Sequence, residues 1–178
     1  MFVPLCGKSL DLLWLGDQGH SVSGIELSPI ALESFCLENG IPARRRVLVD
    51  FDVYETGHFS LYRGDFFTLT SPLLGSVAAV YDRAALISWA PPLRSRYVGH
   101  LASLMPPGSQ MLLVAVEYPE HEMNGPPFSV SPAAIEELYA PHYSIDLLGR
   151  HEILDLEPRL RARGLTQLSE IVYRLKRL

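Results

Sequence analysis

The alternation of short apolar runs with helix-forming segments constrains the fold of this chain more than any other feature of its sequence. The run Met1–Leu5 is followed by apolar residues at helical spacing in residues 10–14, and the run Ser21–Leu27 by a helical segment that ends at Gly40. Such alternation is typical of βαβ units, in which helices connect parallel strands and cover both faces of a sheet. The sequence therefore predicts an α/β protein with a doubly wound, mostly parallel sheet.

The remaining apolar runs supply the other strands and helices. Strands are expected at Phe59–Arg63, Val77–Tyr81, Gln110–Val116, Tyr143–Leu148, Ile153–Leu154 and Ser169–Leu175, with a further short one at Val47–Val49, and helices over residues 29–39, 93–105 and 131–139. Pro4 has no amide hydrogen to donate to a sheet, so we expect it at the end of the first strand. Met1 then lies within that strand, which predicts that the first strand is truncated.

Length and composition indicate one globular domain over residues 1–178. Of the 178 residues, 48% are apolar and 20% are charged, which is enough to bury a sizeable core. The net charge is −5, and the densest basic run, Arg44–Arg46, follows Gly40 and Pro42 and is interpreted as a solvated loop. Because binding to phosphate backbones depends on clustered Lys and Arg, we expect no nucleic-acid partner.

The chain carries no feature of a secreted or membrane protein. Its two cysteines, Cys6 and Cys36, argue against a disulfide framework and for a reducing compartment. No apolar run approaches the ~20 residues of a membrane helix, and the N-terminus lacks the order of a signal peptide. We expect a cytoplasmic protein that acts as a monomer on a small molecule.

The turn after the first strand is the first candidate for a binding site. In Leu5-Cys6-Gly7, glycine lets the backbone approach a ligand, and the helix that follows is expected to present free N–H groups. Glu26 lies 19 positions after Gly7, at the end of the next strand. A carboxylate at this spacing can accept hydrogen bonds from both ribose hydroxyls of a nucleoside. An ordinary turn and a surface glutamate are the simpler interpretations of each feature alone.

Two residue pairs follow later strands. Asp65-Phe66 can accept a hydrogen bond from an adenine amino group and pack against the ring, whereas a loop acid beside a core aromatic is the simpler interpretation. Asp82-Arg83 offers an arginine for a ligand carboxylate, with a surface salt bridge as the alternative. Ligands of doubly wound sheets bind at the carboxyl ends of the strands, which favours a functional role.

Several other kinds of site are excluded by spacing. A phosphate-binding loop ending in Gly7-Lys8-Ser9 requires glycine at position 2, which is Phe2. A nicotinamide fingerprint requires three glycines, and the turn has only Gly7. The six histidines are scattered without metal-ligand spacing, so no metal is expected, and no G-x-S-x-G elbow occurs.

The motifs around these candidates resemble those of bacterial thiopurine S-methyltransferases. The matching segments are Val3–Ser9 (VPLCGKS), Leu12–Leu15 (LLWL), Gly19-His20, Gly24–Ser28 (GIELS) and Asp82–Leu86 (DRAAL). The resemblance extends over essentially the whole chain. It implies a class I methyltransferase fold with a seven-stranded sheet, mostly parallel with the last strand antiparallel, and S-adenosylmethionine as the methyl donor.

The resemblance also implies roles for individual residues. Leu5 and Gly7 correspond to the cofactor turn, and Glu26 to the acid on the ribose. Asp65 and Phe66 correspond to the adenine pocket and Arg83 to a further cofactor-site residue. Arg159 matches an arginine of the family that is proposed to face the thiopurine. No side chain is expected to act as a catalytic acid or base.

The expected activity follows from the resemblance: methyl transfer to the sulfur of an aromatic or heterocyclic thiol. Family members carry an N-terminal segment that closes over the cofactor, and in this sequence the segment is expected to be absent. The alternatives are therefore a truncated form that binds the cofactor with weak or no activity and, on a similar sheet, a nicotinamide-dependent oxidoreductase.

Overall fold

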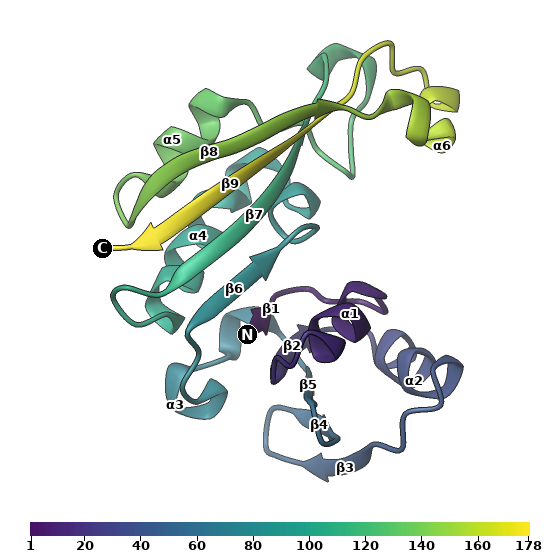
Figure 1. Ribbon diagram of the computed structural model, residues 1–178, viewed down its shortest axis with the longest axis vertical. Coiled ribbons are helices and arrows are strands. Elements are labelled where there is room, and N and C mark those ends of the chain that lie inside the picture. The colour runs from purple at the N-terminus through teal and green to yellow at the C-terminus, as the bar shows by residue number, and fades with distance from the viewer. The chain divides into compact units, whose positions relative to one another are not determined.

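The computed structural model describes residues 1–178, and the chain divides into two compact units, Met1–Tyr81 and Asp82–Leu178. Both units combine strands with helices, so the predicted α/β class is confirmed (Figure 1). The prediction of one domain over residues 1–178 stays a prediction. None of the helices has the length and apolar character that crossing a membrane requires.

The first unit is built on strands that follow the expected βαβ order. Its strands are β1 (Phe2–Val3), β2 (Val22–Glu26), β3 (Arg44–Val47), β4 (Asp52–Glu55), β5 (Phe59–Arg63) and β6 (Ala79–Asp82), the last of which ends on the first residue of the second unit. Its helices are α1 (Asp11–Asp17), α2 (Pro29–Glu38), the 3-10 helix η1 (Phe66–Thr68) and α3 (Ser71–Leu74). The strands lie in the order β3-β4-β5-β2-β1-β6, and β5, β2, β1 and β6 are parallel.

Local sequence explains where these elements begin and end. Ser28 accepts a hydrogen bond from the amide of Ala31 and Pro29 occupies the first turn of α2, so the cap and the fixed proline φ both favour a helix start there. β1 is only two residues long and stops before Pro4, as expected.

Gly24 of β2 is required by close packing. A β-carbon at Gly24 would lie 2.8 Å from the sulfur of Cys6 and 3.0 Å from a methyl of Leu61. The surrounding core holds fully buried Leu12, Leu32 and Phe35, and it fixes α1 and α2 against the sheet.

The second unit is an antiparallel sheet with helices. Its elements are β7 (Gln110–Glu117), β8 (Tyr143–Glu152), β9 (Ser169–Arg177), α4 (Pro91–Leu104), α5 (Pro132–Tyr139) and α6 (Pro158–Ala162), with 3-10 helices η2 (Leu86–Ser88), η3 (Glu120–Glu122) and η4 (Leu154–Leu156). The strand order is β7-β9-β8, and β9 is antiparallel to both neighbours. Figure 1 shows α4 and α5 on one face of this sheet.

The structure corrects five expectations about secondary structure. Nine strands are present instead of seven, because β3 and β4 form an antiparallel hairpin on β5. Arg44–Arg46, interpreted as a loop, belong to β3. The strand expected at Val47–Val49 is not found there, because only Val47 is in a strand, as the last residue of β3. Ile153–Leu154 is not a strand, since η4 begins at Leu154. The helix expected from residue 93 begins at Pro91, because proline is compatible with the first turn of a helix.

Candidate cofactor site

The turn after β1 has an unusual backbone. Leu5 has φ +47° and Gly7 φ +53°, both in the left-handed region. For leucine this conformation costs on the order of 1 kcal/mol, and such residues persist where their surroundings enforce them, often at ligand sites. The enforcement is visible here, because the amide of Cys6 donates to the carbonyl of Ile25 at 2.9 Å and ties the turn to β2.

Glu26, at the end of β2, is held by two backbone amides from different segments. The amide of Gly7 donates to Oε2 at 3.0 Å, and the amide of Ser28 donates to Oε1 at 2.8 Å. The side chain is half-buried. Each carboxylate oxygen has two lone pairs and uses one of them here, so each keeps one position for an outside donor. The carboxylate is therefore fixed in orientation and still able to accept two hydroxyl groups.

The amides of this turn are largely used within the protein. Besides Gly7, the amide of Ser9 donates to the carbonyl of Cys6 at 3.2 Å, and the amides of Asp11 and Leu12 donate to the side chain and carbonyl of Ser9 at 3.2 Å each. The expectation that the helix start presents free N–H groups is therefore wrong for Asp11 and Leu12, the first two residues of α1. All these amides are bonded within the protein, which favours a ligand recognised through its hydroxyl groups over one held by several backbone amides.

The cysteine in this turn is a packing group. Burial raises the pKa of the Cys6 thiol well above its usual range, and the nearby charge of Glu26 raises it further. Since the thiolate is the reactive form of cysteine, burial makes Cys6 a poor nucleophile at neutral pH.

Asp65 and Phe66 follow β5, the neighbour of β2. The amide of Gly64 donates to the carbonyl of Glu26 at 3.0 Å, which places Asp65 one residue beyond this contact. Asp65 is exposed and caps η1, because its Oδ1 accepts from the amide of Phe67 at 2.9 Å. The second carboxylate oxygen remains as an acceptor beyond this cap.

Phe66 and Phe67 differ in how much surface a ligand can reach. Phe66 is only 4% exposed, whereas Phe67 is half-buried, and the two rings meet edge to face at 5.3 Å. A ligand ring packing here therefore has more access to Phe67. The sequence analysis missed this residue, although it directly follows the predicted pair.

Arg83, in the second unit, is exposed and directly follows the buried carboxylate of Asp82. Asp82 Oδ1 accepts from the amides of Ala85 and Leu86 at 3.0 and 3.2 Å, and Oδ2 accepts from the hydroxyl of Tyr97 at 2.6 Å. Burial raises the pKa of Asp82 to about 6, and the three hydrogen bonds oppose this rise. Tyr97 was not among the candidates; its only signal was its place on the apolar face of a predicted helix.

Arg159 lies in α6 of the second unit, a helix of five residues, and is exposed. Its neighbour Leu160 packs against a buried cluster that includes Leu165 and Leu168 and fixes the helix. The structure thus brings Leu5, Gly7, Glu26 and the Asp65 turn together in the first unit, and places Arg83 and Arg159 in the second.

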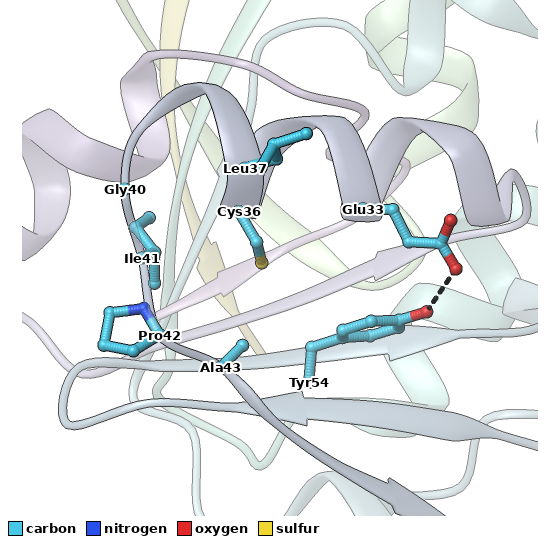
Figure 2. Close-up of a pocket in the computed structure, with 8 residues that line it drawn as sticks. All are labelled: Glu33, Cys36, Leu37, Gly40, Ile41, Pro42, Ala43 and Tyr54. Carbon is cyan, nitrogen blue, oxygen red and sulfur yellow. Dashed lines mark hydrogen bonds between the residues drawn. The ribbon is translucent and has the colours of Figure 1, made fainter.

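A separate hollow in the first unit lies at the other end of α2. Its volume is about 480 Å³, and Figure 2 shows its lining residues, Glu33, Cys36, Leu37, Gly40, Ile41, Pro42, Ala43 and Tyr54. The hydroxyl of Tyr54 donates to Glu33 at 3.2 Å across it. None of the predicted site residues lines this hollow. No group of three or more His, Cys, Asp or Glu side chains is arranged to hold a metal ion.

Comparison with known proteins decides the family. The profile of the thiopurine S-methyltransferase (TPMT) family matches residues 1–178. The chain belongs to the TPMT family. It is 47% identical over 177 residues to the thiopurine S-methyltransferase of Methylococcus capsulatus, an alignment that covers 99% of this chain and 80% of the relative. As a member of the TPMT family, the chain is assigned to the methyltransferases, as expected from the VPLCGKS turn.

Solved structures agree on the fold. A methyltransferase from Methanosarcina mazei superposes with a TM-score of 0.69 at 18% identity, covering 99% of this chain and 91% of the other. The 1,6-didemethyltoxoflavin-N1-methyltransferase of Burkholderia thailandensis, solved with S-adenosylhomocysteine, has a TM-score of 0.57 at 16% identity, covering 97% and 69%. At these identities the similarity establishes the Rossmann-like methyltransferase fold for the TPMT-family chain.

Proposed function

We propose that this protein transfers a methyl group from S-adenosylmethionine to the sulfur of an aromatic or heterocyclic thiol. Membership of the TPMT family supports the reaction class, and the neighbour solved with S-adenosylhomocysteine supports the cofactor. The observation that carries the proposal is the carboxylate of Glu26, oriented by the amides of Gly7 and Ser28 with one acceptor position left on each oxygen. Two neighbouring ribose hydroxyls are the matching donors.

The residues of the first unit fit the other parts of the same ligand. The left-handed turn at Leu5 and Gly7 brings backbone next to Glu26, and Asp65 offers a carboxylate oxygen for the adenine amino group. Phe66, with the more accessible Phe67, offers an aromatic edge for the adenine ring. The amides of Gly7, Ser9, Asp11 and Leu12 are already bonded within the protein, which suits a nucleoside without phosphates. In the second unit, we assign Arg83 to the cofactor and Arg159 to the acceptor by family resemblance.

The chemistry requires positioning more than proton transfer. Bound S-adenosylmethionine supplies a methyl group on a positively charged sulfur. Aromatic thiols ionise readily, so the acceptor needs no strong general base from the protein. The protein's contribution is to bind both molecules in line and to keep water away from them. We therefore assign no side chain as a catalytic acid or base.

A methyl-transfer assay tests the acceptor class. Radiolabelled S-adenosylmethionine is incubated with the protein and 6-mercaptopurine, and in parallel with hypoxanthine, which carries oxygen in place of the sulfur. We expect label in the thiol product and at most background label with hypoxanthine. Equal labelling of both would contradict a sulfur acceptor. Binding of S-adenosylhomocysteine without any transfer would favour the alternative of a cofactor-binding but inactive form.

A further inference from the structure

We propose that Tyr97 is a positioning residue for the turn that carries Arg83, and that it acts through the carboxylate of Asp82. The inference rests on the proposed function only in assigning Arg83 to the cofactor. The contacts themselves all lie within the second unit.

The carboxylate of Asp82 joins this turn to Tyr97. Its carboxylate binds the amides of Ala85 and Leu86 on one oxygen and the hydroxyl of Tyr97 on the other, at 3.0, 3.2 and 2.6 Å. Arg83 lies inside the loop that the Asp82–Ala85 bond closes. The carboxylate therefore fixes the backbone of Arg83 from both sides, and the hydroxyl of Tyr97 fixes the carboxylate.

Helix α4 also contacts both ends of the segment formed by residues 82–89. Tyr97 binds Asp82, where the segment begins. Arg94 lies about one helical turn before Tyr97 on the buried face of α4 and donates to the carbonyl of Trp89 at 3.1 Å, where the segment ends. The other end of the Arg94 guanidinium donates to the carbonyl of Ser129 at 2.9 Å. Arg94 and Tyr97, two polar side chains on an otherwise apolar helix face, thus bind the two ends of residues 82–89.

A carboxylate at this buried position costs free energy that an apolar side chain would not. Asp82 is 1% exposed and Tyr97 is 0% exposed. A buried carboxylate is unfavourable unless donors satisfy it, and an apolar pair of similar size would fill the same space at no such cost. A role in holding the turn accounts for a carboxylate at this place, whereas packing alone does not.

Tyr139 provides a matched control for the hydroxyl of Tyr97. It is also 0% exposed, it lies on α5 of the same unit, and its buried hydroxyl has no hydrogen-bond partner. Tyr97→Phe and Tyr139→Phe therefore remove the same atom from the same kind of environment. Only Tyr97→Phe breaks a bond to Asp82.

The first experiment measures amide hydrogen exchange of residues 83–88, which requires no cofactor. We expect Tyr97→Phe to raise exchange of the Ala85 and Leu86 amides about tenfold or more over the wild-type protein, as for the loss of a bond to a charged group. Tyr139→Phe should leave these amides within about twofold of wild type. Circular dichroism checks that each variant is folded. Equal exchange in both folded variants would overturn the proposal.

The second experiment measures S-adenosylhomocysteine binding by calorimetry. Tyr97→Phe should weaken binding about five- to twentyfold, and in an Arg83→Ala background the same change should alter it less than twofold, because residues in one network are not additive. An equal loss in both backgrounds would show that Tyr97 acts on the fold and not through Arg83. If wild type did not bind, the proposed function would fail, while the exchange result would still decide the role of Tyr97.

Discussion

The buried carboxylate of Asp82 makes the stability of the protein depend on pH in a direction opposite to that of most paired acids. Its pKa is raised from the ordinary 3.8 to about 6 in the folded protein, chiefly by burial. The folded state therefore holds a proton that the unfolded chain releases. The stabilisation is fully present below about pH 4 and is lost as the pH rises through 6. The difference between the two pKa values corresponds to about 3 kcal/mol.

Asp82→Asn isolates this contribution. Asparagine keeps an oxygen for the amides of Ala85 and Leu86, and its NH2 can donate to the oxygen of Tyr97. Between about pH 4.5 and pH 7.5, we expect the free energy of unfolding of wild type to fall by about 2 kcal/mol relative to that of the variant. This is less than the full difference, because part of the proton release occurs below pH 4.5. Urea unfolding of both proteins at the two pH values measures this, since other groups titrate alike in both. If the difference in the free energy of unfolding between the two proteins stayed constant within about 0.5 kcal/mol at both pH values, Asp82 would not have a raised pKa in the folded state.

Two predictions concern packing and buried polar groups. Gly24→Ala should lower the free energy of unfolding by about 1–3 kcal/mol, because its β-carbon would lie 2.8 Å from the sulfur of Cys6, and adding Cys6→Ala should recover part of this loss. Urea unfolding of wild type, the single variant and the double variant checks this, and a single variant as stable as wild type would contradict it. Arg94→Met should lower the free energy of unfolding by about 1–3 kcal/mol, because the carbonyls of Trp89 and Ser129 lose their donor, and Arg94→Lys should lose less. Equal urea midpoints for the two variants would show that the donor does not matter.

Elements set by local chemistry were predictable from the sequence. Ser28-Pro29 and Ser131-Pro132 each combine a side-chain cap with a proline in the first turn, and both begin a helix in which the serine accepts from the third amide along. Gly7 and Glu26 were likewise recognisable as candidates from their places at the ends of the first two strands, and the structure joins them by the bond from the Gly7 amide to the Glu26 carboxylate.

Features that depend on partners distant in sequence were not predictable. Arg45 lies on an exposed edge strand and pairs with Asp52, a carboxylate that also binds Arg63 at 2.8 Å. The charges that stabilise this strand are the same charges that suggested a loop. The bond between Tyr97 and Asp82 was equally hidden, since it joins residues whose proximity is created only by packing of α4.

The central claim is that Glu26 binds the ribose of S-adenosylmethionine. Calorimetric titration with S-adenosylhomocysteine of the wild type and Glu26→Gln tests it most directly. The control is Glu33→Gln, which changes an exposed glutamate of the same unit that accepts a hydrogen bond from Tyr54. Loss of charge-assisted hydrogen bonds should cost ~1.5–3 kcal/mol, or about 10- to 100-fold in affinity, with the control within about twofold of wild type. A folded Glu26→Gln protein that bound as tightly as wild type would contradict the claim.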